Sequence, residues 1–293
     1  MAFFVALVID GALTGALYAL VALAFVVVYR ASGMINFALG ETLTLASRLV
    51  AFGVHGLGLG LAGGVVVGCA GMVAAMLGFN AAVLRRLAGR PVIALLMITI
   101  GLAALMRGAT PLLLAGVPAM LIVAPPAPLM VAGIAVATEK MVAAAVAAAC
   151  IAAVSVSLKR SRTGVALRAI ADDQQSAMAV GIDLHRYFGL AWGLVGLVSV
   201  VAGTLWAVAA GGGFGVALVG LKVFPVVILG GVDSIGGSIV AAVLIGVLES
   251  LAAGYVDPLV GGGFSTVASY LVLLAVLFVR PCGLFGRADA RRI

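Results

Sequence analysis

Residues 3–29 read FFVALVIDGALTGALYALVALAFVVVY, and this run indicates the fold class. It contains one charged residue, Asp10, and it exceeds the roughly 20 apolar residues that a helix needs to cross a bilayer core. No basic region precedes the run and no small-residue cleavage site ends it. We therefore expect a retained membrane span rather than a signal peptide.

The rest of the chain has the same character. Of its 293 residues, 65% are hydrophobic and only 9% are charged, whereas a soluble domain carries roughly 25% charged residues. Water-soluble classes are therefore excluded, because so few charges cannot cover a body of this size. The three cysteines have no metal-ligand spacing, so we expect no metal site.

Apolar runs separated by short polar or Gly/Pro-rich breaks recur along the whole chain. They lie at 3–29, 40–57, 61–84, 91–115, 130–158, 187–210, 214–232, 236–254 and 264–280. The pattern predicts an all-α, polytopic transmembrane bundle that forms one domain over residues 1–293, with eight or nine membrane segments. The run 214–232 is a candidate broken or re-entrant element, because it has many glycines together with Lys222 and Pro225.

Basic residues fall in clusters between these runs, and the clusters set the expected topology. Short loops rich in Lys and Arg stay in the cytoplasm. The clusters are Arg85/Arg86/Arg90, Lys159/Arg160/Arg162/Arg168 and Arg280/Arg287/Arg291/Arg292. An even number of crossings separates each cluster from the next, so all three clusters can lie on the same side of the membrane. This topology puts the N-terminus outside and the C-terminus in the cytoplasm.

The longest polar interruption is 162–186, RTGVALRAIADDQQSAMAVGIDLHR. Its apolar positions are compatible with a helical stripe, Thr163 can serve as the N-cap, and Gly181 can end the helix with Ile182 folding back in a Schellman motif. A loop that only joined two spans would need a few residues. We therefore expect a cytoplasmic surface helix that meets the headgroups or a partner protein.

Glycines bracket two further stretches between apolar runs, Ser32–Glu41 and Gly230–Gly237. Two glycines cost a helix up to about 2 kcal/mol relative to alanine, and an Asn side chain can bond backbone groups that a break frees. We expect a break with Asn36 bonded to backbone or a neighbouring helix, with Glu41 starting the next helix, and a matching break at the second stretch. The alternative is an ordinary cytoplasmic turn in which Asn36 and Glu41 are exposed.

Ionisable residues inside apolar runs are candidates for function, because an unpaired charge costs several kcal/mol at mid-bilayer. Glu41, Lys222 and Glu249 are candidates for lining a path or bracing a break. Asp10 and the Glu139/Lys140 pair are instead expected near an interface or paired locally. The remaining ones are Arg48 and Arg107.

The sequence lacks two kinds of catalytic motif. No lysine is followed by Ser or Thr, so there is no P-loop to hydrolyse ATP. No Gly-x-Ser-x-Gly motif occurs, and the only histidines are His55 and His185, so a membrane-embedded hydrolase lacks a nucleophile and base set. The chain is expected not to be an enzyme.

Several motifs along the chain resemble the motifs of one family and occur in the same order as in that family. They are SGMINFALGE at 32–41, PVI at 91–93 with TIG at 99–101, LRA at 167–169 with AMAVGI at 177–182, KVFP at 222–225 with GGVDSIGG at 230–237, and RPCGLFGR at 280–287. Together they are similar to branched-chain amino-acid permeases of ABC importers, the LivH type, over essentially the whole chain. Three departures are Leu39 where the family usually has His, the Asp172-Asp173 pair in the coupling segment, and Arg48 within a span. They affect the expected substrate and leave the fold unaffected.

The resemblance implies a permease subunit of a bacterial ABC importer in the cytoplasmic (inner) membrane. Its solute would be a branched-chain or related amino acid, or a similar small polar solute such as urea or a small carboxylate. The implied partners are a second homologous permease, two cytoplasmic ATPase subunits that bind ATP and Mg, an extracytoplasmic substrate-binding protein and the bilayer; no cofactor in this chain and no nucleic acid are expected. An energy-independent channel or an ion-coupled secondary transporter is the alternative, with the buried charges as a relay.

The resemblance, together with the buried charges and the glycine pattern, assigns expected roles to residues. The ATPase-coupling residues are Arg168, Ala169, Asp172, Asp173, Ala177, Gly181 and Ile182. The residues of the translocation path or of the helix breaks are Asn36, Phe37, Glu41, Lys222, Gly230, Gly231, Ser234, Gly237 and Glu249.

Overall fold

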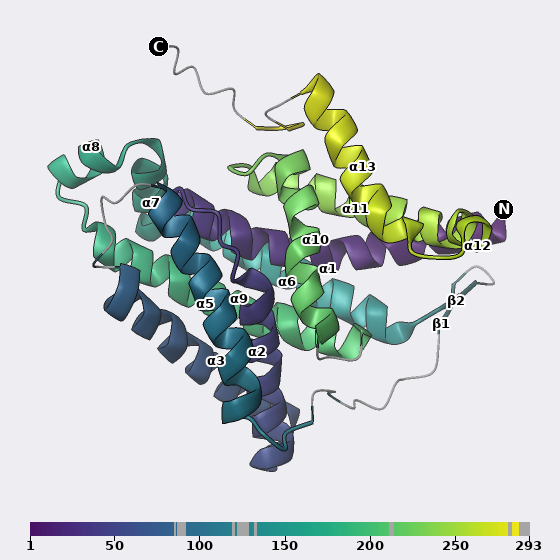
Figure 1. Cartoon of the computed structure of the whole chain (residues 1–293), viewed down its shortest axis with the longest axis horizontal. Helices are drawn as coiled ribbons and strands as arrows, with labels where there is room; N and C mark the ends of the chain where they lie inside the picture. The colour runs from purple at the N-terminus through teal and green to yellow at the C-terminus, as the bar shows by residue number, and fades with distance from the viewer. Residues whose placement is uncertain are drawn as a thin grey trace. The chain divides into compact units, whose positions relative to one another are not determined.

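The computed structural model describes residues 1–84, 86, 92–118, 121, 129–131, 134–210, 214–280 and 283–286, and they are mostly helical (Figure 1). The α-helices are α1 (Ala2–Ser32), α2 (Leu39–Ala51), α3 (Gly60–Phe79), α5 (Val92–Leu113), α6 (Thr138–Arg160), α7 (Arg162–Asp172), α8 (Gln174–Ala179), α9 (Leu184–Ala210), α10 (Phe214–Gly230), α11 (Ile235–Tyr255), α12 (Asp257–Val260) and α13 (Phe264–Val279). Two π-helical turns, η1 (Phe52–Gly56) and η2 (Asn80–Leu84), extend α2 and α3. The predicted all-α class is confirmed.

Six of the described helices are long and apolar enough to cross a membrane: α1, α3 with η2, α5, α6, α9 and α11. The other three predicted segments contain shorter helices, α2, α10 and α13, of which α10 and α13 are apolar. Of these, α10 has 17 residues and α13 has 16. At 1.5 Å per residue α10 is about 26 Å long, slightly less than the bilayer core. A polytopic bundle is thus confirmed, with the predicted segments differing in length.

The predicted basic clusters lie only partly within the described residues. Arg86, the cluster from Lys159 to Arg168, and Arg280 are described. The remaining members, Arg85, Arg90, Arg287, Arg291 and Arg292, lie outside the described residues.

The predicted run 130–158 is wrong at its N-terminal end. A short antiparallel hairpin, β1 (Leu129–Val131) and β2 (Ile134–Val136), pairs Leu129 with Val136, and α6 begins only at Thr138. Hydropathy alone does not distinguish a strand from a helix in so short a run. The β-branched residues at 131, 134 and 136 favour the extended form.

The chain forms two compact units, of which the first comprises Met1–Val26, Ala124–Ile151 and Lys222–Ile293. In this unit α1 and α11 run antiparallel in close contact. A Cβ added at Gly11 would lie 2.5 Å from Val247 Cα, and one at Gly15 would lie 2.7 Å from Val243 Cα. Small residues of this kind let two apolar helix backbones approach, which is how helices associate in a membrane.

The second unit comprises Val27–Val123 and Ala152–Leu221. Its core lies where α2, α3 and α9 meet. Trp192 of α9 is fully buried, and its ring centroid lies 5.2 Å from that of Phe79 of α3. The close backbone contacts of Gly203 with Leu43 and of Gly196 with Met72 join α9 to the other two helices.

The segment 162–186 is not the single helix that the sequence predicted. It forms α7 and α8, which meet at Asp173 in an extended conformation (φ −156°, ψ 114°). The Asp173 carboxylate accepts hydrogen bonds from the Gln175 and Ser176 amides and so starts a new helix. The predicted N-cap Thr163 is also wrong, because Ser161 Oγ accepts the Gly164 amide at 3.1 Å instead.

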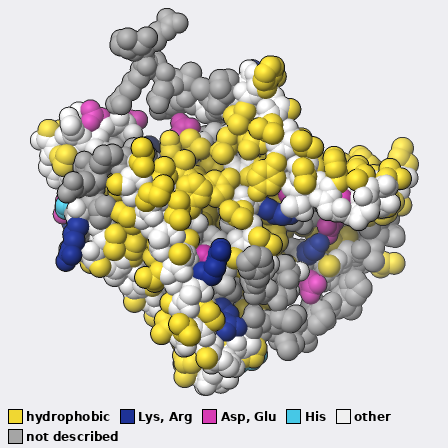
Figure 2. Space-filling view, in the orientation of Figure 1, with side chains coloured by type: hydrophobic (Ala, Val, Ile, Leu, Met, Phe, Trp, Pro, Cys, Tyr) yellow, Lys and Arg dark blue, Asp and Glu magenta, His cyan; other side chains and the backbone are white. Residues whose placement is uncertain are grey.

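Large hydrophobic side chains are exposed on many of the long helices, as on Leu105 and Leu112 of α5 and Phe278 of α13. On the face that Figure 2 shows, hydrophobic side chains are widely spread and charged side chains gather in a few small clusters. Such a surface is the reverse of a soluble protein's surface and fits lipid or partner helices.

Candidate functional site

The first helix break lies between α1 and α2. Gly33 has a left-handed φ of 66°, and Ser32 Oγ donates to the Val28 carbonyl at 2.8 Å, which ends α1. Asn36 Oδ1 accepts the Ala38 amide at 3.0 Å, just before α2 begins. The predicted break with Asn36 bonded to backbone is therefore present.

The break is held inside the protein by α5. Thr99 Oγ1 accepts the Phe37 amide at 3.3 Å and donates to the Leu96 carbonyl at 2.8 Å. Asn36 is 1% exposed and Glu41 is 6% exposed. The alternative interpretation of an ordinary exposed turn is therefore wrong. Non-helical backbone at membrane depth requires surrounding protein of this kind.

Glu41 lies in the first turn of α2 and pairs with Arg107 of α5. Arg107 donates from Nε at 2.7 Å and from Nη2 at 2.6 Å to the same carboxylate oxygen. Further along both helices, Arg48 Nη2 donates to the Leu114 carbonyl at 3.0 Å. The two arginines thus satisfy part of their hydrogen-bonding capacity across the same pair of parallel helices.

A second polar cluster forms in the first unit, from Tyr18 of α1, Lys222 of α10 and Glu249 of α11. Tyr18 OH donates to Glu249 Oε2 at 2.7 Å, and Lys222 Nζ lies 3.1 Å from the same oxygen. Lys222 Nζ also lies 3.3 Å from the Tyr18 oxygen. Two residues that were predicted separately, Lys222 and Glu249, therefore form an ion pair.

The second break separates α10 from α11. Gly231 has a φ of 96°, and Ser234 Oγ accepts the Gly237 amide at 3.0 Å as the N-cap of α11. A Cβ at Gly230 would lie 2.6 Å from the Gly237 carbonyl carbon. The predicted matching break is therefore present, and the close approach of Gly230 to Gly237 leaves no room for larger side chains.

The segment 162–186 ends as the sequence predicted. Gly181 has a φ of 85°, its amide donates to the Met178 carbonyl at 3.0 Å, and the Ile182 amide donates to the Ala177 carbonyl at 3.0 Å. These two bonds are the pair that defines a Schellman ending. Within α8, the side chain of Ala177 is buried, whereas that of Met178 is exposed.

The other predicted coupling residues differ in exposure. Arg168 is half-buried, with its Nη1 donating to the Leu158 carbonyl at 3.0 Å, and Ala169 is half-buried as well. Asp172 and Asp173 are exposed. The segment therefore offers an acidic pair at its centre.

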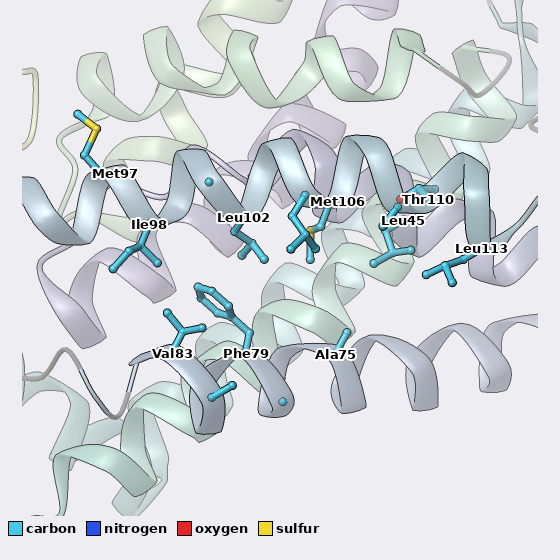
Figure 3. A pocket seen from close by; sticks show the side chains of 15 residues that line it. Leu45, Ala75, Phe79, Val83, Met97, Ile98, Leu102, Met106, Thr110 and Leu113 are labelled. Atoms are coloured by element: carbon cyan, nitrogen blue, oxygen red, sulfur yellow. The ribbon is translucent and has the colours of Figure 1, made fainter.

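A cavity of about 670 Å³ lies in the second unit between α3 and α5. Figure 3 shows Phe79 and Ala75 of α3 on one side and Leu102 and Met106 of α5 on the other. Thr110 is the only polar residue among those that line it. The cavity suits an aliphatic chain and offers no charged group to a polar solute.

Two partners of the predicted charges were not assigned to the site from sequence, Tyr18 and Arg107. Tyr18 lies near the middle of α1, whereas Tyr in membrane helices is enriched at the interfaces. The position of Tyr18, far from either end of its span, was therefore the feature of the sequence that could have identified it as a site residue. Among the residues that the structure describes, no group of His, Cys, Asp and Glu could hold a metal ion.

Comparison with known proteins identifies relatives over the whole length. The chain is 27% identical to the high-affinity branched-chain amino acid transport system permease protein LivH of Escherichia coli (strain K12), over 99% of this chain and 98% of the relative. It is 26% identical to the corresponding protein BraD of Pseudomonas aeruginosa, over 97% and 96%. A probable branched-chain amino acid permease of Methanocaldococcus jannaschii is 31% identical over 44% of this chain and 42% of the relative.

No solved structure gives a match to the chain. The family described as the permease component of the branched-chain amino acid transport system matches residues 7–280. This match covers both helix breaks, the ion pairs Glu41–Arg107 and Lys222–Glu249, and the segment 162–186. The chain therefore belongs to the family of branched-chain amino acid transport permeases.

Proposed function

We propose that this chain is the permease subunit of an ABC importer that carries a branched-chain amino acid, or a closely related one, into the cytoplasm. The family match and the full-length relatives, which are named for this transport, support the proposal. The chain would supply the path, and separate subunits would supply the energy.

The observation that carries the proposal is the form of the segment 162–186. Its two short helices bury Leu167 and Ile170 of α7 against this chain and leave Val165, Met178 and Val180 exposed. These apolar side chains are 57%, 54% and 77% exposed, and Asp172 and Asp173 of the same segment are exposed as well. Such a mixed surface suits a partner protein better than it suits lipid alone.

In this proposal the ATP and Mg sites belong to two cytoplasmic ATPase subunits, since the chain has no P-loop. A second homologous permease and an extracytoplasmic binding protein complete the assembly. Residues 1–293 act as one permease domain, and its residues Arg168, Ala169, Asp172, Asp173 and Ile182 lie on or beside the contact with the ATPase.

The proposed orientation places the N-terminus outside and the C-terminus in the cytoplasm of the bacterial inner membrane. Within the first unit, Lys140 Nζ lies 2.6 Å from Asp10 Oδ1, so that the N-terminal parts of α6 and α1 are adjacent. Both helices have basic residues in their last turn, Arg30 in α1 and Lys159/Arg160 in α6. The positive-inside rule favours a cytoplasmic location for basic helix ends of this kind.

The proposed path includes the two helix breaks and the ion pairs Glu41–Arg107 and Lys222–Glu249. Backbone that leaves helical geometry at membrane depth occurs where it lines a cavity or is enclosed by protein. The buried side chains of Asn36, Glu41 and Glu249, together with Phe37 and Lys222, supply polar and aromatic groups there. Gly230, Gly231, Ser234 and Gly237 form the second break.

Reconstitution in liposomes tests the proposal. The chain is purified with the ATPase subunits that accompany it, and uptake of radiolabelled L-leucine is measured in the presence of the binding protein. We expect uptake only with both ATP and the ATPase. Uptake that persists without an ATPase and follows an ion gradient would instead establish the secondary transporter.

A further inference from the structure

The cluster contains Tyr18 and Lys222, near the middle of α1 and α10, and Glu249 from the C-terminal half of α11. Each of these helices is strongly apolar. The Glu249 side chain is 11% exposed and the Lys222 side chain is 26% exposed. The cluster is therefore a small, largely buried group of polar and charged side chains among apolar helices.

The hydrogen bonds in this cluster are distributed unevenly. Both Tyr18 OH and Lys222 Nζ point to Oε2 of Glu249, at 2.7 and 3.1 Å. The other carboxylate oxygen, Oε1, is buried and has no hydrogen-bond partner within the described part of the chain. A buried charged oxygen without a donor is costly, so the site is complete only when a further donor reaches Oε1.

Lys222 has the complementary capacity. An ammonium carries three donors, and its side chain retains some accessibility. One end of the cluster therefore accepts a cationic donor and the other end donates to an anion.

Stability alone does not account for the pair. Replacing a buried ion pair by neutral groups of similar volume is often neutral or stabilising, because desolvation offsets the attraction of the charges. Intramembrane ionisable residues accordingly mark substrate or ion pathways more often than they serve packing.

We propose that Lys222 and Glu249 bind the two charged groups of an amino-acid zwitterion as it passes through the permease. The ammonium of the solute donates to Glu249 Oε1, and Lys222 donates to the carboxylate of the solute. Tyr18 is a positioning residue that holds Oε2, so that Oε1 stays directed to the solute. This inference rests on the proposed function, because it names the groups that recognise that class of solute.

Charge is balanced in both states of the site. When the site is empty, Lys222 and Glu249 neutralise each other across 3.1 Å. When it is occupied, each residue faces an opposite charge on the solute, and the net charge is again zero. No proton has to move, and a solute that lacks either charge leaves one residue unpaired, which disfavours it.

The test is a neutral double variant, Lys222→Met with Glu249→Gln, beside each single variant. The double variant removes both charges without leaving either one unpaired, so it is expected to fold and to assemble with the ATPase. L-leucine imported per ATP hydrolysed is measured in liposomes that contain the full transporter. We expect a fall of at least about tenfold in this ratio, which corresponds to loss of one hydrogen bond to a charged group.

The matched control is Asp10→Asn with Lys140→Met, which removes the other Lys–carboxylate pair of the same unit. It is expected to keep the wild-type ratio. If the Lys222/Glu249 double variant assembles and imports L-leucine at the wild-type ratio, the pair is structural and the inference is wrong. If the wild-type transporter imports no amino acid at all, the proposed function fails together with it.

Discussion

Glu41 and Arg107 form an ion pair whose partners are unequally buried. The Glu41 side chain is 7% exposed and the Arg107 side chain is 66% exposed. Removing the arginine would leave a buried carboxylate without the two donors Nε and Nη2. Removing the carboxylate would leave a guanidinium that is largely exposed. The cost of breaking the pair should therefore depend on which partner is removed.

A double-mutant cycle on this pair has a definite expected result. Arg107→Ala should lower the melting temperature in detergent more than Glu41→Gln, and Glu41→Gln added to Arg107→Ala should recover part of the loss. The expected coupling energy is about 0.5–3 kcal/mol. Additive losses in the double variant would show that the contact contributes nothing beyond its two side chains.

Individual residues differed in how well the sequence identified them. Asn36 and Glu41 could be predicted, because glycines frame them and their side chains act on the adjacent backbone. Tyr18 could not be assigned, since its partners Lys222 and Glu249 are far away in the chain and only the packing of α1 against α10 and α11 brings them together. Pairing between distant helices is a tertiary property that one sequence does not contain.

At the scale of elements, the crossing of α2 with α10 depends on two glycines in contact. A Cβ at Gly40 would overlap the Ala217 carbonyl oxygen, and one at Gly220 would overlap the Gly40 backbone. Backbone atoms cannot move aside as a flexible side chain can. The helices must therefore separate if either glycine gains a side chain.

Gly40→Ala should consequently destabilise the protein by about 1–3 kcal/mol, as overpacking does. Gly108→Ala in α5 is the matched control, because nothing lies within 4 Å of a Cβ at that position. The control should be neutral or slightly stabilising, since alanine favours a helix over glycine by up to about 1 kcal/mol. Thermal unfolding in one detergent gives both values, and equal melting temperatures for the two variants would contradict the tight crossing.

The loop between α12 and α13 depends on Asp257. Its Oδ1 accepts the Ser265 amide at 2.9 Å and its Oδ2 accepts the Ser265 hydroxyl at 2.7 Å. The hydroxyl of Ser265, followed by its amide, holds the pKa of Asp257 below its ordinary value. Because the pKa is lowered in the folded state, this stabilisation is full above the ordinary pKa and is lost as the pH falls through the lowered one.

Asp257→Asn should therefore melt at a lower temperature than the wild type near pH 7, because the amide cannot accept both bonds in the same way. The difference should shrink as the pH falls below the ordinary carboxyl pKa of about 4. Melting curves at several pH values provide the measurement. A difference that stays constant over the whole range would show that the charge of Asp257 has no part in it.

The elements themselves were predictable to a limited degree. Apolar runs marked the helices, because each span must be apolar over its length, but runs did not mark where helices end. The hairpin at 129–136 and the division at Asp173 both arise from local hydrogen bonds. An aspartate that caps α8 could equally have sat on the surface of one longer helix.

At the scale of the whole molecule, the segment 162–186 is the part whose form suggests how an ATPase would drive the permease. Its last turn is fixed by a single left-handed residue, Gly181 at φ 85°. Met178, whose carbonyl accepts the Gly181 amide, and Val180, which directly precedes Gly181, both have exposed side chains. The direction of these side chains therefore depends on that conformation.

Gly181→Val should impair coupling more than membrane insertion. A β-branched residue strongly disfavours positive φ, at a cost of roughly 1–2 kcal/mol or more, so the last turn of α8 should open and reorient Met178 and Val180. We expect ATP-driven L-leucine uptake to fall several-fold while the amount of permease in the membrane stays unchanged. Gly108→Ala, at an open position with an ordinary φ in α5, is the control and should keep wild-type uptake. If Gly181→Val assembles and transports like the wild type, this segment does not transmit the ATPase cycle, and the contact must lie elsewhere on the chain.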